Sequence, residues 1–429
     1  MFAGSCPIGI AWRLSALNKI DSGIFVHPWD VVHEGAEQVL ETISDLGLSR
    51  INLATSYHAG RYILPRDPKQ RVFHAEEGVV YFKPDLSYFE KSLLKPIRSS
   101  KFADIDIVEL VTRKSKNYNL GANSWTVTLH NSNFAKSHPE LAVVDAFGDV
   151  DQNFICPSHE ETIEYVKGLV RNLVGQYDLN AIQLESIGYP WSLKHNDQHE
   201  IFGSRLEPLV SELITTCFCD KCTELMSKSN LQPEEMKKLV VKIVDTSLRM
   251  PPNVMQSVSP EEIMRNAYVL ASDIDLLHDI LKFRHQCTTE TLQEVRNALR
   301  DMRSRKTQLR LLAQGGSSME FSVGRGCEGI NLGSASRILD GIDLVTYVKE
   351  PEIVYYQVLW TKFEIQEACS LHASLRINFP ITANRAALEA EMNAALEAGA
   401  TGLEFYNYGW TNKKGLEWLK KSLGNIANS

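Results

Sequence analysis

Short apolar runs alternate with helical segments along the whole chain, and the alternation produces eight such runs. They lie at about 23–31, 49–58, 124–132, 180–189, 308–316, 341–348, 373–380 and 402–409. Near-continuous apolar runs are typical of parallel strands that helices cover. Eight of them predict an α/β fold, a closed (β/α)8 barrel of the TIM type. An open doubly wound sheet is the alternative, but it would need a glycine-rich phosphate turn where HPWDVVHEGAE follows the first run.

Two connections between the predicted strands are unusually long. Residues 60–122 contain RVFHAEEGVVYFKPD, which predicts a local hairpin, and then a helix from about 86. Residues 190–305 form a mostly helical insertion after the fourth strand. No linker or low-complexity tract divides the chain, so we expect a single barrel over 1–429. In the shorter connection after the first strand, apolar residues at helical spacing predict one helix near 32–47, which ends at Gly47. Both long connections follow strands and should lie at the carboxyl end of the barrel, where this fold carries its chemistry.

Charge and hydropathy exclude several classes of protein. Lys and Arg number 45 against 53 Asp and Glu, which gives a net charge of −8. Nucleic acids and anionic membranes select basic surfaces, so neither is an expected partner. No run approaches the ~20 apolar residues of a membrane span, and the first residues lack the apolar core of a secretion signal. We therefore expect a cytoplasmic protein. A homo-oligomer is compatible with a barrel of this kind, and the sequence does not specify the oligomeric state.

Three cysteines lie close together in the segment Cys217-Phe-Cys219-Asp-Lys-Cys222. A structural zinc ion takes four ligands, and Cys156, before the helix that leads into the fourth strand, is the candidate fourth. The alternatives are cysteines that merely cluster, or a redox pair. No organic cofactor is expected.

Two segments carry a resemblance to a known family. ICPSHEETIEYV at 155–166 and CFCDKC at 217–222 flank a fourth strand that ends in Glu185. This arrangement resembles glycoside hydrolase family 42, the barrel β-galactosidases. The resemblance implies that the four cysteines hold zinc, that Glu185 is the general acid/base and that the substrate is a carbohydrate.

The sequence also departs from that family. The family places Asn before its acid/base Glu, where this chain has Leu184. The family nucleophile is a Glu at the end of strand seven, whereas LRINFPIT offers Asn378 and no carboxylate. The expected pair of carboxylates is therefore not reproduced on strand seven.

Side chains near the carboxyl ends of barrel strands converge on one pocket. Sugar sites need aromatic faces and polar groups that fix hydroxyls, and the predicted strand ends offer both. The candidate substrate-binding residues there are His27, Trp29, Asp30, Tyr57, His58, Arg61, His130, Asn131, Gln314, Tyr347, Lys349, Asn378 and Tyr406. Core packing is the alternative for Trp29, and a bond to its own loop for Arg61.

Three more candidates follow the fourth strand. Trp191 could serve as a sugar platform or pack in the core. His195 and His199, four residues apart, could line the pocket, bind a metal ion or lie on a surface helix.

Glycosidic cleavage commonly uses one protonated and one ionised carboxyl group. Glu185 is the expected acid. Glu404 is the expected partner, because strand alternation gives it the same face as Tyr406. The alternatives are an ion pair of Glu404 with Arg376 or Lys349, and a role for Glu185 in orienting a histidine.

These patterns favour a glycoside hydrolase that acts on a soluble oligosaccharide or glycoside. One alternative is another carbohydrate enzyme on the same barrel, a lyase, epimerase or metal-dependent hydrolase that uses His27, His58, His130 and Glu185. The other is a non-catalytic sugar-binding barrel, which the missing carboxylate on strand seven keeps open.

Overall fold

The computed structural model describes residues 20–190, 210, 213–249, 274–302, 307–314 and 328–427. The predicted Trp191, His195 and His199 lie outside these residues. Within the described ranges, no helix is both long and apolar enough to cross a membrane.

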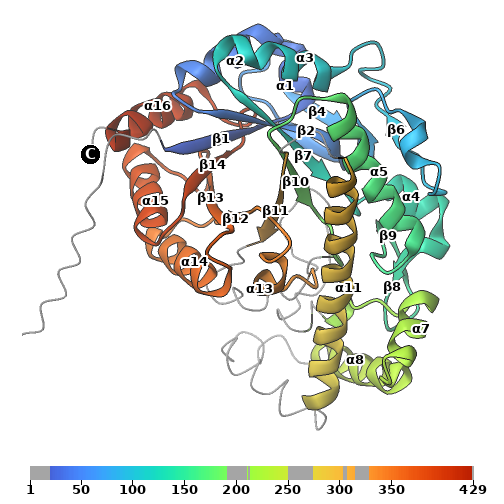
Figure 1. The fold of residues 1–429 in the computed structure, drawn as a ribbon. Coiled ribbons are helices and arrows are strands. Elements are labelled where there is room, and N and C mark those ends of the chain that lie inside the picture. Colours follow the sequence, from blue (N-terminus) through green and yellow to red (C-terminus); the bar gives the residue numbers. More distant parts are fainter. Residues whose placement is uncertain are drawn as a thin grey trace, which may run out of the picture.

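Eight parallel strands form a closed barrel (Figure 1). They are β1 (Asp21–Val26), β2 (Arg50–Tyr57), β7 (Gly121–Val127), β10 (Ala181–Glu185), β11 (Gln308–Gln314), β12 (Gly341–Val345), β13 (Ser370–Arg376) and β14 (Gly402–Tyr406). Strand β1 pairs in parallel with both β2 and β14, which closes the sheet. The predicted (β/α)8 fold is confirmed, and each predicted run contains most of one strand.

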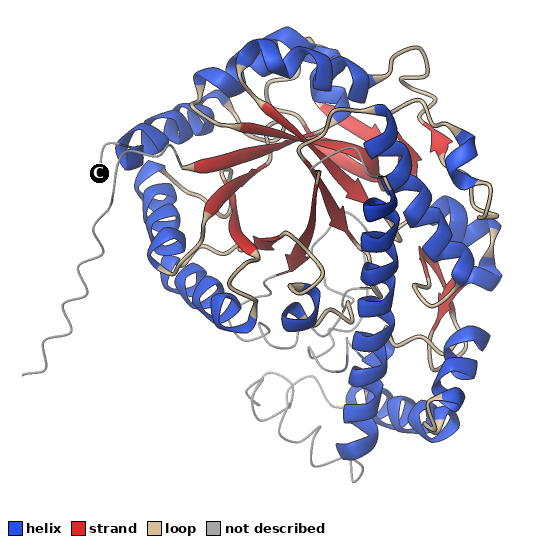
Figure 2. Ribbon diagram, in the orientation of Figure 1, coloured by secondary structure: helices blue, strands red, loops and turns tan. Residues whose placement is uncertain are grey.

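Helices surround the barrel on its outside (Figure 2). They are α1 (Pro28–Glu34), α2 (Ala36–Asp45), α3 (Ile107–Lys114), α5 (Glu160–Gln176), α11 (Ile274–Asp301), α13 (Leu332–Ala335), α14 (Pro351–Glu364), α15 (Arg385–Glu397) and α16 (Lys413–Ala427). The single helix predicted near 32–47 is wrong in one respect. Gly35 has φ 94°, a left-handed conformation that glycine adopts without strain, and it separates α1 from α2.

The connection between β2 and β7 differs from its prediction. The segment around 71–85 supplies β4 (Val72–Ala75) and β5 (Val79–Val80), but β4 pairs with the upstream β3 (Gly60–Ile63). Strand β5 instead pairs with the end of β2 and with β6 (Ile97–Arg98). Only a 3-10 turn, Leu86–Phe89, forms where a helix was expected, and α3 begins after the Asp106 cap.

A second, smaller core lies beside the barrel. It joins β8 (Ala142–Val144) and β9 (Val150–Ile155) to α7 (Asp220–Lys228), α8 (Pro233–Leu248) and the amino-terminal half of α11. The short helix α4 (Ser132–Ser137) precedes β8. All four cysteines of the predicted cluster belong to this core.

An ion pair occupies the amino half of the barrel interior. The Arg310 guanidinium donates to Asp343 through Nη2 to Oδ1 at 2.6 Å and through Nε to the same oxygen at 3.1 Å. Gln183 Nε2 donates to Asp343 Oδ2 at 2.9 Å. Asp343 is fully buried, so these bonds replace the water that its carboxylate loses.

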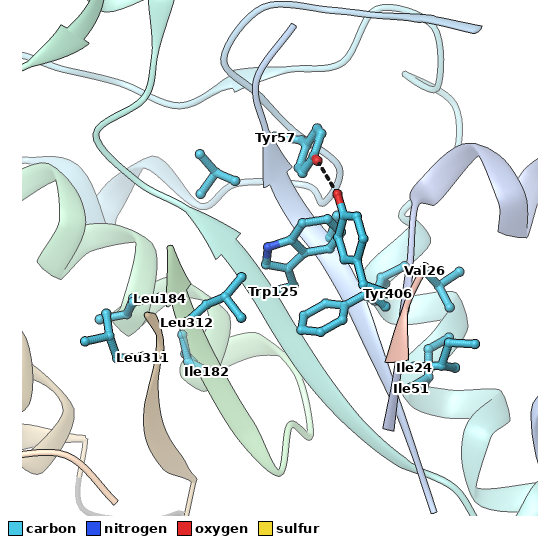
Figure 3. Packing of buried hydrophobic residues seen from close by; sticks show 14 of the residues in the cluster. Ile24, Val26, Ile51, Tyr57, Trp125, Ile182, Leu184, Leu311, Leu312 and Tyr406 are labelled. Carbon is cyan, nitrogen blue, oxygen red and sulfur yellow. Dashed lines mark hydrogen bonds between the residues drawn. The ribbon is translucent and has the colours of Figure 1, made fainter. Parts of the chain in front are cut away.

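A second buried carboxylate lies in the same half. Glu404 accepts from Arg50 Nη2 at 2.5 Å and from Asn52 Nδ2 at 2.5 Å, and its Oε1 lies 2.9 Å from His372 Nδ1. The carboxyl half of the interior is aromatic instead, with Trp125 and Tyr406 facing inward (Figure 3). The barrel interior therefore divides into a charged half and an aromatic half.

Removing one member of a buried pair should destabilise the barrel strongly. Arg310→Met leaves the Asp343 carboxylate buried beside Gln183, so we expect the free energy of unfolding to fall by about 3–5 kcal/mol. The measurement is urea unfolding followed by circular dichroism. In the double variant Arg310→Met/Asp343→Leu most of this loss should be recovered. The exposed pair Lys116–Asp178 is the control, since Lys116→Met should change stability by less than about 1 kcal/mol. A double variant no more stable than Arg310→Met would contradict the pairing.

Candidate active site

Glu185 is the last residue of β10, and its side chain lies inside the carboxyl half of the barrel. Trp125 Nε1 on β7 donates a hydrogen bond to Glu185 Oε2 at 2.5 Å. The glutamate is 9 % exposed. Burial raises the pKa of Glu185 to about 7, although the Trp125 bond favours the ionised form. A substantial fraction of this carboxyl group is therefore protonated at neutral pH.

Aromatic side chains surround Glu185. Tyr57, Trp125, Tyr347, Tyr406 and Trp410 are named here the aromatic cup. The Tyr57 and Tyr406 hydroxyls lie 3.3 Å apart, and the Tyr347 and Tyr406 ring centroids 5.2 Å (Figure 3 shows Tyr57, Trp125 and Tyr406). Burial, neighbouring hydroxyls and the charge of Glu185 all raise the pKa of Tyr57. Glu185 also contributes to the raised pKa of Tyr347 and Tyr406, after burial. The acid and the cup therefore lie together in the carboxyl half of the barrel.

The predicted residues after β1 are packed into the structure. Trp29 is fully buried, with its ring stacked on His27 at 4.2 Å and on Phe73 at 4.3 Å, which fits the core-packing alternative. Asp30 Oδ2 accepts from the His27 backbone N–H at 3.0 Å and caps α1. Burial raises the pKa of Asp30 to about 8 and lowers that of His27. His27 Nδ1 lies 3.0 Å from Asn407 Nδ2.

Two histidines stack beside the cup. The His58 and His130 ring centroids are 4.4 Å apart, and His130 stacks in turn on Phe154 at 4.4 Å. Asn131 caps α4 by accepting from the Phe134 backbone N–H at 3.1 Å. Arg61 lies on the exposed side of β3. The structure therefore places His58 and His130 near each other but gives Asn131 a local bond.

The later strands place their candidates at different depths. Gln314 ends β11 and is half-buried, as is Asn378 after β13, while Lys349 is exposed. Glu404 faces inward, but one inward position closer to the amino end of β14 than Tyr406. Burial would raise the pKa of Glu404, but the Arg50 charge and the His372 bond lower it to about 2. Its ion-pair partner is thus Arg50, and His372 lies within hydrogen-bond distance, in place of the Arg376 or Lys349 considered from the sequence.

A buried carboxyl group that sequence reasoning missed lies close to Glu185. Glu328 is 5 % exposed, and its carbonyl accepts from the Tyr189 backbone N–H at 3.0 Å. Burial and then the charge of Glu185 raise the pKa of Glu328 to about 8, while Arg284 opposes this rise. The sequence signal was weak, because Glu328 lies in a connection well beyond β11. In the structure its backbone lies against Gly188, where a Cβ would lie 1.9 Å from the Glu328 carbonyl oxygen.

The four predicted cysteines converge. Their sulphur atoms all lie within 4.8 Å of one another, with Cys156–Cys222 at 3.4 Å and Cys156–Cys219 at 3.9 Å. Tetrahedral zinc with ~2.3 Å bonds to sulphur needs ligand sulphurs ~3.8 Å apart. None of the four forms a disulfide. The geometry fits a zinc ion, and backbone N–H groups that point at sulphur support thiolates, as Val144 N does at 3.4 Å from Cys217 Sγ.

A second group of potential metal ligands lies in the amino half of the barrel, where arginines already balance its carboxylates. Asp343, His372 and Glu404 lie within metal-binding distance of one another. Arg310 and Arg50 bond the two carboxylates, so this group is an ion-pair network in the structure. A cavity of about 380 Å³ opens beside it at the amino end of the barrel, away from Glu185.

Solved structures with the same fold include several glycoside hydrolases. The glycoside hydrolase domain of PgaB (BpsB) from Bordetella bronchiseptica matches with a TM-score of 0.60 and 12 % identity, over 94 % of this chain and 99 % of that one. The β-amylase catalytic domain from Paenibacillus polymyxa matches with 0.55 and 10 %, over 96 % and 100 %. A β-galactosidase from Marinomonas ef1 matches with 0.54 and 10 %, over 95 % and 59 %. At these identities the likeness shows the fold. No family model and no curated protein matches the sequence.

The Trp125 hydrogen bond should set the acidity of Glu185. The indole N–H stabilises the ionised carboxylate, so Trp125→Phe should raise the pKa of Glu185 further, by about one unit. Carbon-13 NMR titration of glutamate carboxyl groups measures this change, with Glu185→Gln used to assign the signal. Trp418→Phe on α16 is the control and should leave that pKa unchanged. A lower pKa in Trp125→Phe would contradict the assigned bond.

Proposed function

We propose that this protein is a glycoside hydrolase that cleaves a glycosidic bond in a soluble oligosaccharide or glycoside. The observation that supports it most is the position of Glu185, a buried carboxyl group with a pKa near 7 at the end of a barrel strand and inside the aromatic cup. The fold shared with known glycoside hydrolases is consistent with this proposal.

Glu185 acts as the general acid in this proposal. A proton donor for a departing sugar oxygen must be protonated at working pH and must then carry the negative charge that remains. Burial supplies the first condition, and the Trp125 N–H stabilises the carboxylate that forms. The rings of Tyr347 and Trp410, which are the partly exposed members of the cup, would hold the apolar side of a sugar ring.

Glu328 is our choice for the second carboxyl group, in place of Glu404. The ion pair with Arg50 holds the charge of Glu404 in the amino half of the barrel. Glu328, in contrast, lies near Glu185, whose charge adds to the effect of burial in raising the pKa of Glu328. Two interacting carboxyl groups lose their protons in two steps that belong to the pair, so one acid and one base coexist at a pH between those steps.

Variants of Glu185 and Glu328 should differ in how strongly their activity depends on the leaving group of the substrate. Glu185→Gln should lower kcat/KM by at least ~100-fold on an aryl glycoside with a poor leaving group, and by much less with dinitrophenolate, which leaves without a proton. The wild-type rate should fall as the pH rises above about 7, because Glu185 then loses its proton. Glu328→Gln should lose activity on both substrates and recover part of it with azide.

Glu417→Gln, on the exposed face of α16, is the control and should retain full activity. A panel of α- and β-aryl glycosides identifies the sugar, and proton NMR of the first product gives the stereochemical course. Sugar binding without turnover of any of these substrates would overturn the hydrolase in favour of a sugar-binding barrel.

We also propose that Cys156, Cys217, Cys219 and Cys222 bind one structural zinc ion, which would fix the helical insertion to the barrel. Ser158 supports this role with its hydroxyl 3.3 Å from Cys222 Sγ and its backbone N–H 3.5 Å from Cys156 Sγ. Such outer contacts orient ligands and stabilise thiolates. The zinc would take no part in the chemistry, because all four of its positions hold protein ligands.

Zinc content tests this assignment. The purified protein should contain about one zinc per chain by mass spectrometry of the metal, and Cys222→Ser should lose it together with thermal stability. Cys369→Ser, at another buried cysteine, is the matched control and should keep the metal. A metal-free wild-type protein of undiminished stability would contradict the proposal.

A further inference from the structure

An arginine ends the inward-facing row of β13. In the register of the barrel Ser374 pairs with Glu404 and Arg376 pairs with Tyr406. Paired residues of neighbouring parallel strands point to the same side of the sheet, so Arg376 points into the barrel like Tyr406. It therefore lies at the level of the aromatic cup.

Aromatic rings of the cup surround the Arg376 guanidinium. Its central carbon lies 5.3 Å from the ring centre of Tyr347, 5.5 Å from that of Trp410 and 5.7 Å from that of Tyr406. Ring faces attract a cation, but they supply no hydrogen-bond acceptor oxygen. The rings thus position the guanidinium without using its N–H donors.

Arg376 differs in its partners from the other arginines inside the barrel. Arg50 and Arg310 are each bonded to a buried carboxylate. Across the part of the chain that the structure describes, Arg376 forms no ion pair, and its Nε atom is buried without a hydrogen-bond partner. A buried donor without an acceptor costs free energy. Arg376 is also partly exposed, so a ligand can reach it.

The guanidinium and the proposed acid both lie near the same two rings, Tyr347 and Tyr406. Arg376 and Glu185 have opposite effects on the pKa of Tyr347 and Tyr406, smaller than that of burial. No ion pair joins Arg376 to Glu185. A sugar on these rings would therefore lie near both a proton donor and a positive charge.

We propose that Arg376 binds the carboxylate of a uronic acid residue in the substrate, so that the enzyme acts on acidic glycosides. This inference rests on the proposed function and names its substrate class. A guanidinium binds a carboxylate through two parallel hydrogen bonds, and one positive charge matches one carboxylate. Neutral sugars would offer hydroxyl oxygens to the donors of Arg376, but no negative charge to match the guanidinium.

Paired substrates test this subsite. We expect kcat/KM for the preferred aryl uronide, glucuronide or galacturonide, to exceed that for the matching glucoside or galactoside at least ~10-fold. Arg376→Gln should lower the uronide value by roughly 10- to 150-fold, the range of a hydrogen bond to a charged group, and change the neutral value only a few-fold. Arg376→Lys should recover part of the uronide activity. Arg385→Gln, on the exposed start of α15, is the control.

Binding measurements separate this inference from the proposed function. Glucuronate, galacturonate and their neutral parents are titrated into Glu185→Gln, with and without Arg376→Gln, and followed by tryptophan fluorescence. Uronate binding that depends on Arg376 supports the subsite even if no glycoside is hydrolysed. Hydrolysis of neutral glycosides with no preference for uronides would overturn the subsite and leave the hydrolase standing. A preference for sulfated or phosphorylated sugars would overturn the carboxylate assignment.

Discussion

The pairing of buried charges in the amino half of the barrel is the constraint on which the site depends. Asp343 and Glu404 are fully buried, and Arg310 and Arg50 make their burial tolerable. The same side-chain type behaves differently at the other end of the barrel. Among the residues that the structure describes, Glu185 has a tryptophan N–H but no cation as its hydrogen-bond partner, so burial raises its pKa. The cations beside Glu404 instead lower the pKa of that group. Position along the barrel axis thus decides which carboxyl group can hold a proton.

The sequence was sufficient for the fold and for the cysteine cluster. Parallel strands that helices cover leave a periodic pattern, and the three thiols of residues 217–222 are so close in the chain that local folding brings them together. The pattern also indicated that Glu404 faces inward with Tyr406. It could not indicate depth, because the stagger of neighbouring strands decides which residues share a level. Glu328 escaped detection because it belongs to a connection, where no periodicity applies.

Tyr189 links the cysteine cluster to the site. Its hydroxyl lies 3.0 Å from Ser158 Oγ and 3.7 Å from Cys222 Sγ, while its backbone N–H bonds Glu328. The residue follows β10, the strand that ends in Glu185. The helical insertion therefore contacts the same short segment that carries the proposed acid. This contact gives the insertion a role in holding the active site as well as in covering the barrel.

The close passage of Gly188 beside Glu328 has a mechanical consequence. The missing side chain at position 188 lets two main-chain segments approach closely, because any Cβ there would overlap the Glu328 carbonyl. The backbone N–H of Tyr189 bonds that carbonyl at 3.0 Å, so a peptide hydrogen bond joins the segment after Glu185 directly to the one that carries Glu328. A larger residue at position 188 would therefore push apart the two segments that hold the proposed carboxyl pair.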